Sequence, residues 1–496
     1  MTKEIYMKLI YTFFCMLYFF AGKAQSIDSL ALTSFSDAVL ELQNSELIRN
    51  GTLSVNVKSV TDKKTIFAIN SEKSLPSASI LKLVSTATIL SVLGGDFRYQ
   101  TFLEYDGFIN KDTLTGNIYI RGTGDPALGS ERFKDYPSST ALINRWTAAI
   151  QKAGIKYIKG DILSDASYFD SNTLADSWIW ADLGNYYGAG VSGLNFNDNQ
   201  YRIKFKPGVD EGDPAAFLGI EPAIPYLTFA NRVTTGERGS GDKTIVYGNP
   251  LSNNVILTGT VPRGVPAFSV KGSIPDPGAY AAFALKQNLV NVIPVISETL
   301  AVKETKPSMM LTAKTILDEY KSPPLKEICQ QANFWSVNLY ADSFLKKAGK
   351  TLEGKSEYND AAKAVTNYWV NRSADMRGFF IKDGSGLSPS GSVTTNNITD
   401  ILSLATKEAS YSDFYKSIAI LGVNGTVRNL GKGTKAAGNV RAKSGSFEGT
   451  RAYAGYVTTK SGAVLSFAII ANKYQQESSR IVSEELVRLM TLLAEL

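Results

Sequence analysis

Near the start of the chain stands Pro76-Ser-Ala-Ser-Ile-Leu-Lys-Leu-Val84. This stretch predicts a helix with a serine cap at Pro76-Ser77 and a glycine stop at Gly94-Gly95. The helix is apolar nearly all round, as expected of a helix inside a core. Ser79 and Lys82 would share one of its faces, because residues three apart are neighbours on a helix. The lysine amine can then reach the serine hydroxyl, which predicts a nucleophile paired with an amine base.

The 496-residue composition contains no histidine. This absence excludes Ser-His-Asp and Cys-His catalysis and HExxH zinc sites, so acid–base chemistry must use Lys, Asp, Glu, Ser or Tyr. A free lysine amine, with a pKa near 10.4, is a poor base at neutral pH. Burial and a second cation would lower the pKa of Lys82, and Lys443 is the candidate for that cation. The sequence indicates no metal site and no cofactor.

A second short element, Ser336-Val-Asn338, falls between a predicted helix that ends near Asn333 and another that begins near Leu339. A turn there can present both polar side chains together. The serine would pass a proton to a leaving amine, and the asparagine would hold the substrate backbone and the lysine amine. Helix capping is the alternative interpretation of such a serine.

A third element, Lys443-Ser444-Gly445, is expected at the start of the first of two terminal strands. The glycine would let a substrate chain approach the strand edge closely. The lysine amine and the serine hydroxyl can bind a terminal carboxylate. Ser446 would offer its backbone N–H as an oxyanion donor beside that of Ser79, which lies at a helix N-terminus.

Each of these strings has a second copy in the chain, so none is specific alone. Ser343-Phe-Leu-Lys346 lies within a predicted helix without a cap and is interpreted as structural. Ser252-Asn-Asn254 matches the second string. Lys460-Ser461-Gly462 occupies a predicted hairpin turn, where these residue types need no function beyond turning the chain.

The N-terminus has the pattern of a secretory signal. Lys3 and Lys8 precede an apolar run from Leu9 to Phe20, and small residues follow as far as Ala24. The run is too short to span a bilayer comfortably. We therefore expect a signal peptide over residues 1–24 and export to the periplasm, with an uncleaved anchor as the alternative. Export would leave Cys329 as a single core thiol without a disulfide partner.

The remaining chain predicts one discontinuous α/β (α+β) domain interrupted by a large insertion. Residues 25–95 and 291–496 would form its two parts, and the β-rich residues 96–290 would be the insertion, with two subdomains favoured. A helix is expected near Ser139–Ala153. Strands are expected at Arg451–Thr459 and Ala463–Asn472, before a final amphipathic helix over residues 478–496.

The net charge of +6 is small for a chain with 52 basic and 46 acidic residues, so no nucleic-acid surface is indicated. A mildly basic exterior suits an anionic polymer but does not require one. The oligomeric state is not indicated, and peripheral association with a membrane is left open.

S-x-x-K, S-D-N and K-T-G form the motif set of class A β-lactamases and penicillin-binding proteins. With its three elements, this chain resembles that superfamily and, within it, the class C low-molecular-mass penicillin-binding proteins, which are D-Ala-D-Ala carboxypeptidases and endopeptidases. Ser79 and Ser336 are about half a chain apart, which leaves room for the large insertion of that class. Further segments resemble the family: Arg121-Gly-Thr-Gly-Asp-Pro126, Trp180-Ala-Asp-Leu-Gly-Asn-Tyr-Tyr187, Asn195-Phe-Asn-Asp-Asn199, Asp383-Gly-Ser-Gly-Leu-Ser388 and Val440-Arg-Ala-Lys-Ser-Gly445.

The resemblance implies a penicillin-binding/β-lactamase-like transpeptidase domain that acts on peptidoglycan stem peptides and is acylated by β-lactams. It makes Ser79 the nucleophile, Lys82 its base and Ser336 the proton relay. It makes Asn338 the residue that positions substrate and base, and Lys443 and Ser444 the electrostatic and carboxylate-binding elements. It also implies that an acidic residue of the insertion, Asp165, faces the substrate side chain.

Four positions depart from the family pattern. Ser444 stands for the usual threonine and keeps the hydroxyl, whereas Val337 replaces a common aspartate. Pro389 and Glu448 stand where relatives often carry polar or basic contacts, which leaves the preference for the third stem residue open. A β-lactamase and a non-catalytic binder of peptidoglycan or β-lactams are the alternatives to a periplasmic DD-carboxypeptidase with endopeptidase activity on cross-links.

Overall fold

The computed structural model describes residues 28–249, 252–292, 302–304 and 313–496. The expected signal peptide, residues 1–24, lies outside the described residues. Within the described ranges, no helix combines the length and the apolar character that a membrane-spanning segment needs.

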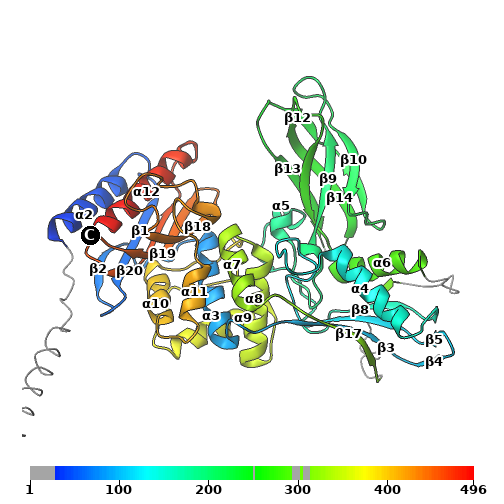
Figure 1. Ribbon diagram of the computed structural model, residues 1–496. Coiled ribbons are helices and arrows are strands. Elements are labelled where there is room, and N and C mark those ends of the chain that lie inside the picture. Colours follow the sequence, from blue (N-terminus) through cyan, green and yellow to red (C-terminus); the bar gives the residue numbers. More distant parts are fainter. Residues whose placement is uncertain (1–27, 250–251, 293–301, 305–312) are drawn as a thin grey trace, which may run out of the picture.

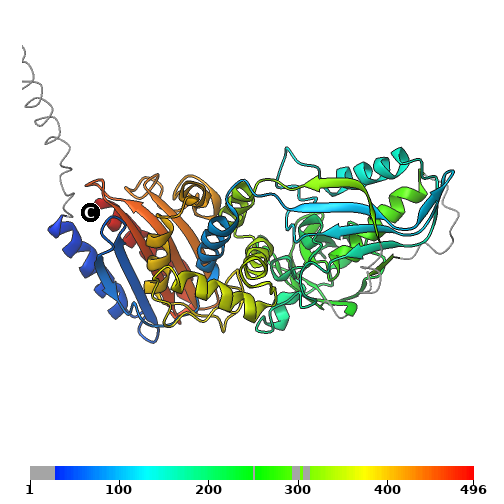
Figure 2. The same cartoon turned by 90° about the horizontal axis from the view of Figure 1, so that it is seen from below.

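The molecule is elongated, with one part built from both ends of the chain and another built from its middle (Figures 1 and 2). A five-stranded antiparallel sheet forms the centre of the first part, in the order β18-β19-β20-β1-β2. Its strands are β1 (Thr52–Ser59), β2 (Thr65–Ile69), β18 (Val440–Phe447), β19 (Thr450–Thr458) and β20 (Val464–Asn472). Two segments some 380 residues apart in sequence therefore share one sheet.

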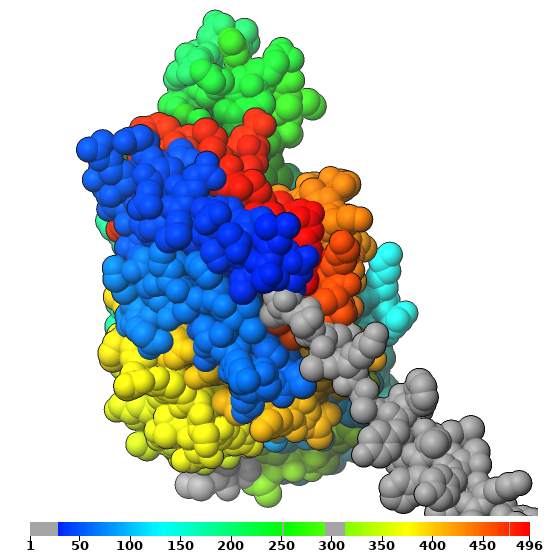
Figure 3. All heavy atoms as spheres, turned by 90° about the vertical axis from the view of Figure 1, so that its left-hand side faces the viewer, coloured from blue at the N-terminus to red at the C-terminus, as the bar shows by residue number. Residues whose placement is uncertain are grey.

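Two helices from opposite ends of the chain, α2 (Ser29–Asn44) and α12 (Ser479–Glu495), pack against each other over this sheet. Figure 3 shows them side by side, in blue and red. Each buries one apolar stripe, as an amphipathic surface helix does. Phe35 and Val39 of α2 and Leu486 and Met490 of α12 are buried in the same cluster as the sheet residues.

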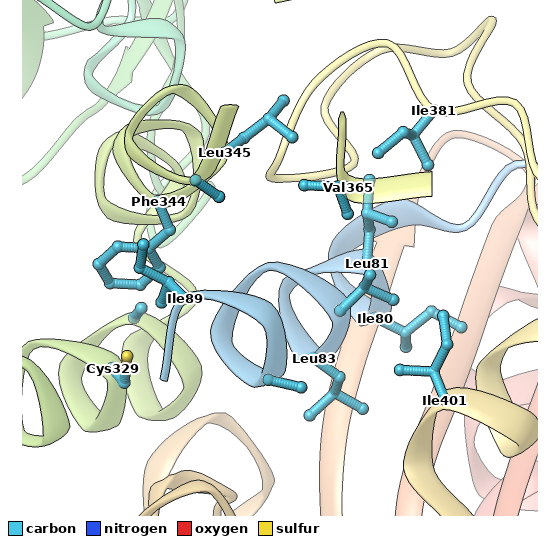
Figure 4. Packing of buried hydrophobic residues seen from close by; sticks show 14 of the residues in the cluster. Ile80, Leu81, Leu83, Ile89, Cys329, Phe344, Leu345, Val365, Ile381 and Ile401 are labelled. Atoms are coloured by element: carbon cyan, nitrogen blue, oxygen red, sulfur yellow. The ribbon is translucent and has the colours of Figure 1, made fainter. Parts of the chain in front are cut away.

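The other side of the sheet carries the helices that surround the Ser79 segment. This segment comprises a 3₁₀ helix, η1 (Ala78–Leu81), which continues into α3 (Lys82–Leu93). Its neighbours are α7 (Leu325–Trp335), α8 (Asn338–Glu353), α9 (Tyr358–Val370), α10 (Thr395–Ala405) and α11 (Tyr411–Ser417). Figure 4 shows Ile80, Leu81, Leu83 and Ile89 enclosed by side chains such as Cys329, Phe344 and Ile401. The prediction of a core helix is confirmed, and Cys329 is a buried free thiol.

The two ends of this helix behave differently. Gly94 has a φ of +78° and ends α3, as its glycine stop predicted. The predicted serine cap is wrong, because the Ser77 side chain makes no capping hydrogen bond and the first turn is 3₁₀ rather than α. Ser79 therefore lies in the tighter turn, and Lys82 is the first residue of the α-helix.

The Lys443-Ser444-Gly445 element also differs from its prediction. It lies within a separate strand, β18, and not at the start of the first terminal strand. A tight turn with Gly449 at a φ of +68° folds β18 back onto β19, so that Lys443 pairs with Ala454. β18 is an edge strand, which leaves one side of its backbone available to the neighbouring 3₁₀ helix and to ligands.

The inserted part contains several sheets. The first has the order β16-β8-β6-β3-β17 and is covered by α4 (Ser139–Lys152) and α6 (Pro277–Val290), which pack together; a small sheet, β4-β5-β7, lies beside it. The strands of these two sheets are β3 (Gln100–Tyr105), β4 (Phe108–Asn110), β5 (Thr113–Thr115), β6 (Ile118–Gly122), β7 (Tyr157–Lys159), β8 (Ile162–Asp165), β16 (Val302–Glu304) and β17 (Thr315–Lys321).

A second group of strands projects from this base (Figure 1). It comprises the sheet β10-β9-β15 and a sheet in which β14 pairs with β11, β12 and β13. The strands are β9 (Gln200–Lys206), β10 (Ala216–Glu221), β11 (Thr228–Asn231), β12 (Thr234–Gly236), β13 (Lys243–Asn249), β14 (Ser252–Pro262) and β15 (Phe268–Ser273).

The insertion ends later than the sequence indicated. α6 does not return the chain at residue 291 but packs on the inserted sheet, and β17 pairs antiparallel with β3 from Thr315 to Lys321. The ladder hydrogen bonds hold this strand in the inserted sheet. The chain returns to the helices of the first part only with α7, which begins at Leu325.

Candidate active site

Ser79 is held in place by a strained backbone. Ala78, directly before it, has a φ of +44°, a conformation that residues with a Cβ rarely adopt. Gly386 lies against this residue, and a Cβ at position 386 would be 2.0 Å from the carbonyl oxygen of Ala78. Such strain persists only where the surroundings enforce it, and it is frequent at functional sites.

Lys82 forms the centre of a hydrogen-bond network. Its Nζ donates to Ser79 Oγ at 2.9 Å, to Asn338 Oδ1 at 2.6 Å and to the Ser385 carbonyl at 2.8 Å. The side chain is fully buried. Asn338 in turn donates from Nδ2 to the Tyr187 carbonyl at 2.7 Å. The amine therefore contacts the hydroxyl that it is expected to deprotonate.

Burial lowers the pKa of Lys82 to about 8, while the Asp342 and Asp383 carboxylates oppose this shift. A lysine with this pKa is substantially neutral near pH 8 and can act as a base. The sequence predicted that burial and the Lys443 cation would both lower the pKa of Lys82. Burial is confirmed as the cause, whereas the influence between the two amines is seen in the lowered pKa of Lys443.

Asp342 positions one of the groups that bind Lys82, and the sequence analysis did not identify it. Its Oδ1 accepts from the backbone N–H groups of Gly384 and Ser385, at 2.6 and 3.1 Å, which orients the Ser385 carbonyl toward Lys82. Burial and the neighbouring Asp383 raise the pKa of Asp342 to about 8. Its position four residues after Asn338, on the same face of α8, was the available indication.

We expect Asp342→Asn to shift the pH dependence of acylation to lower pH. The carboxylate raises the pKa of Lys82, so its removal lowers that pKa and leaves more neutral amine at a given pH. An asparagine oxygen can still accept the two backbone N–H groups, and the other carboxylate oxygen has no hydrogen-bond partner. The rate of labelling by a fluorescent penicillin between pH 5.5 and 9 measures the shift. A loss of rate with an unmoved profile would contradict the electrostatic role.

Ser336 and Lys443 form a second pair. Ser336 has left-handed backbone angles, φ 58° and ψ 43°, between the end of α7 and the start of α8, in agreement with the predicted turn. Lys443 Nζ donates to Ser336 Oγ at 3.0 Å and to the Ser444 carbonyl at 2.7 Å. Burial and the nearby Lys82 amine hold the pKa of Lys443 well below its usual range.

A cleft of about 1110 Å³ opens over these groups. It is lined by Ser79, Ser336 and Asn338, by Ser444 and Ser446 of β18, and by Thr426. The Thr426 and Ser444 hydroxyls are 2.8 Å apart and form a polar pair that suits a carboxylate. Thr426 was not singled out in the sequence, and no motif marks it. Lys443 is buried and does not line the cleft, but its Nζ contacts Ser336, which does.

Gly445 serves a different contact from the predicted one. A Cβ on Gly445 would lie 2.9 Å from the Ser79 backbone nitrogen and 3.1 Å from that of Ile80. The glycine therefore lets β18 approach the 3₁₀ helix that carries the nucleophile, rather than only a substrate chain. Ser79 and Ser446 both line the cleft.

Asp165 is separate from this site. It lies at the end of β8, is buried, and accepts from the Ser167 hydroxyl at 2.6 Å, with Lys314 Nζ at 3.6 Å. It does not line the cleft, so the structure gives no support to the expectation that it faces the substrate. The acids that line the cleft are Asp182 and Glu448. Asp182 lies within the Trp180–Tyr187 segment, whose resemblance to the family was the available indication.

The second copies of the motifs lie elsewhere. Ser343 and Lys346 are buried in the middle of α8, where Lys346 Nζ binds Asp170 at 2.8 Å. Ser252 begins β14 of the inserted part. Lys460-Ser461-Gly462 forms the turn between β19 and β20, as predicted.

The arrangement provides two hydroxyls, each hydrogen-bonded to a buried amine: Ser79 to Lys82 and Ser336 to Lys443. It also provides the pair of hydroxyls that lines the cleft. This set can form and break an acyl-serine ester without imidazole.

Comparisons with known proteins agree with this chemistry. The model of the D-Ala-D-Ala carboxypeptidase 3 (S13) family matches residues 37–493. A D-alanyl-D-alanine carboxypeptidase of Actinomadura sp. (strain R39) is 28% identical over 448 residues, which cover 88% of this chain and 80% of that protein. The D-alanyl-D-alanine carboxypeptidase DacB of Haemophilus influenzae is 23% identical over 90% of each chain.

The crystal structure of penicillin-binding protein 4 (DacB) from H. influenzae matches with a TM-score of 0.77 at 22% identity, over 93% of this chain and 99% of that chain. This likeness confirms the expected penicillin-binding fold with its inserted domains. The family match extends over nearly all of the described residues and includes the elements that carry Ser79, Ser336 and Lys443. The chain is a member of the D-Ala-D-Ala carboxypeptidase 3 (S13) family.

Proposed function

We propose that this protein is a serine-type D-Ala-D-Ala carboxypeptidase that works through an acyl-enzyme on Ser79. The observation that carries the proposal is the 2.9 Å hydrogen bond between the Ser79 hydroxyl and the buried Lys82 amine, whose pKa is lowered toward neutrality. Family membership supplies the reaction class.

In the acylation step, Ser79 Oγ attacks the carbonyl of the penultimate D-alanine and transfers its proton to neutral Lys82 Nζ. The backbone N–H groups of Ser79 and Ser446 stabilise the oxyanion. As the C–N bond breaks, Ser336 Oγ delivers a proton to the departing amine of the terminal D-alanine. The proton taken by Lys82 restores the Ser336 hydroxyl, and Lys443 orients it.

In the deacylation step, water attacks the acyl-serine carbonyl and transfers a proton to Lys82. The ester bond then breaks, and the proton returns from Lys82 to Ser79 Oγ.

Before acylation, the Ser444 and Thr426 hydroxyls bind the carboxylate of the terminal D-alanine, which selects substrates with a free C-terminus.

The substrate class that we propose is the peptidoglycan stem peptide, with endopeptidase cutting of cross-links as an additional activity. β-Lactams are proposed as acylating inhibitors, because their strained amide places a carbonyl and a carboxylate at the same two sites. A solved structure of the H. influenzae relative contains a bound β-lactam. We also propose a periplasmic location, which is the expectation from the signal-like pattern over residues 1–24.

Within this function, Asp182 replaces Asp165 as the group that receives the side-chain amine of the third stem residue. Asp182 is half-buried in the cleft wall, whereas Glu448 is exposed. We expect Asp182→Asn to lower kcat/KM about tenfold for Nα-acetyl-Lys-D-Ala-D-Ala, because a charge-assisted hydrogen bond is lost. The diacetylated peptide, without the amine, should not show this loss.

Glu448→Gln is the matched control for this prediction, since it removes the other cleft carboxylate at an exposed position where an ion pair contributes little. Equal losses in kcat/KM for the amine-bearing and diacetylated peptides would contradict the role of Asp182.

One assay separates the proposed function from its alternatives. The purified protein is incubated with a fluorescent penicillin and, separately, with diacetyl-Lys-D-Ala-D-Ala. We expect a stable covalent label that mass spectrometry locates on Ser79, together with release of D-alanine. Rapid turnover of the penicillin would indicate a β-lactamase. Binding of either compound without a covalent label and without D-alanine release would indicate a non-catalytic binder.

A further inference from the structure

A second cavity lies in the inserted part, beside the catalytic cleft. Its volume is about 390 Å³, and its lining is mostly polar. Three cations line it, from three different segments: Arg132, Arg202 of β9 and Lys271 of β15. We call this cavity the basic pocket. Ligand cavities are frequent where separate subdomains meet.

Three acids share the basic pocket with the three cations, but among the residues that the structure describes only one cation is held in an ion pair inside it. Of the acids that line it, Asp198 is bound to Arg132 at 3.0 Å, and Glu221 is bound at 2.6 Å to Lys204, which lies outside the pocket. Glu131 is exposed. Within the described ranges, neither Lys271 nor Arg202 has an ion-pair partner. Burial, together with Arg132 and Arg202, lowers the pKa of Lys271, while the Asp198 and Glu131 carboxylates oppose this shift.

One wall of the pocket has a strained backbone. Asn197, Asp198 and Asn199 are three consecutive residues with φ between +50° and +58°, a strained arrangement. It directs the Asp198 carboxylate between Arg132 and the Tyr340 hydroxyl, which donates to it at 2.8 Å. Tyr340 lies on α8, two residues after Asn338. The pocket is therefore fixed to the helix that begins at the catalytic site.

Lys271 connects the pocket to the cleft. Its Nζ lies 5.4 Å from the centre of the Tyr186 ring, and Tyr186 lines the catalytic cleft. Backbone contacts hold the two walls together, since Ser273 of β15 donates to the Gly184 carbonyl at 2.8 Å. A ligand that extends from the cleft past Tyr186 meets the cations of the basic pocket.

The N-terminus of a helix also favours an anion in the pocket. Ser139 and Thr140, the first two residues of the 14-residue helix α4, line it. Their N–H groups precede the first intrahelical hydrogen bonds, and the positive end of the helix dipole faces the cavity. The helix end adds to the three cations and does not stand alone.

We propose that the basic pocket is a substrate subsite that binds a carboxylate of peptidoglycan beyond the scissile dipeptide. The inference rests on the proposed function, and it gives a role to Arg202 and Lys271, the two pocket cations that have no ion-pair partner within the described ranges. Stem peptides carry free carboxylates on both the cleaved stem and its cross-linked neighbour. The subsite would favour polymeric substrate over small peptides through charge and hydrogen bonds.

The test compares three substrates: diacetyl-Lys-D-Ala-D-Ala, a disaccharide pentapeptide, and its cross-linked dimer. For each larger substrate, the measured quantity is the ratio of its kcat/KM to the kcat/KM of the small peptide. In the double variant Arg202→Gln/Lys271→Gln, we expect this ratio to be about tenfold lower than in the wild type. Arg202→Gln alone, at an exposed position, should give a smaller fall in the same ratio. Lys206→Gln is the matched control, because Lys206 is exposed on the same strand and does not line the pocket.

If the kcat/KM ratio falls for both larger substrates, the bound carboxylate belongs to the cleaved stem. If the ratio falls for the dimer alone, the carboxylate belongs to the neighbouring stem. An unchanged ratio in both variants would overturn the subsite. Equilibrium binding of the dimer gives the same comparison without turnover. Absence of D-alanine release from every substrate would therefore contradict the proposed function, while the binding result still decides the subsite.

Discussion

Replacement of Lys82 by alanine is expected to lower the rate of Ser79 acylation by a penicillin about a thousandfold. General-base catalysis contributes factors of about 10² to 10⁴, and no histidine is available to substitute for the amine. The time course of labelling by a fluorescent penicillin measures this loss, and circular dichroism checks that the variant is folded. A folded variant that is labelled at the wild-type rate would remove the amine from the role of base.

The pH dependence of the wild-type reaction tests the same assignment independently. Burial lowers the pKa of Lys82 to about 8, and only the neutral amine accepts a proton. Acylation should therefore slow as pH falls below about 8, approaching a tenfold loss per pH unit, and level off above it. A rate that stays constant from pH 6 to pH 9 would contradict a base with this pKa.

Ser79→Ala should abolish covalent labelling and D-alanine release completely, because no other nucleophile lies within the Lys82 network. The Lys82, Asn338 and Ser385 contacts do not depend on the serine hydroxyl, so the cleft should still bind substrate. Intact-mass spectrometry after incubation with penicillin measures the adduct. An adduct of unchanged amount on the variant would place the nucleophile elsewhere.

Ser343→Ala is the matched control for this experiment. Ser343 belongs to the second S-x-x-K string, but its hydroxyl is buried in α8 without a hydrogen-bond partner. Its removal should leave labelling intact and cost little stability. The pair of variants separates the effect of position in the fold from the effect of the motif.

The catalytic groups could largely be predicted from the sequence because their types are restricted. Without histidine, a nucleophilic serine requires an amine, and helical spacing brings Ser79 and Lys82 together. The structure also brings Ser336 to Lys443 and Asn338 to Lys82. Predicted position, and not the strings alone, selected these copies over Ser343, which lies within a helix, and Lys460, which lies in a hairpin turn.

The substrate-facing groups could not be predicted in the same way. Asp165 and Asp182 lie in neighbouring segments of the insertion, yet only Asp182 reaches the cleft. The difference depends on how the insertion packs on the catalytic part, which no local pattern records. The late return of the chain after β17 has the same origin, since strand pairing with β3 joins residues more than 200 positions apart.

Local sequence determined which residues could perform the chemistry, because helix periodicity, the glycine stop at Gly94 and the absence of histidine act over short distances or on composition alone. Tertiary structure decided what those residues meet. Burial of Lys82, rather than a second cation, lowers its pKa, and Gly445 serves the approach of a strand to the nucleophile. Desolvation and close backbone packing depend on segments distant in sequence, so they exist only once the chain has folded.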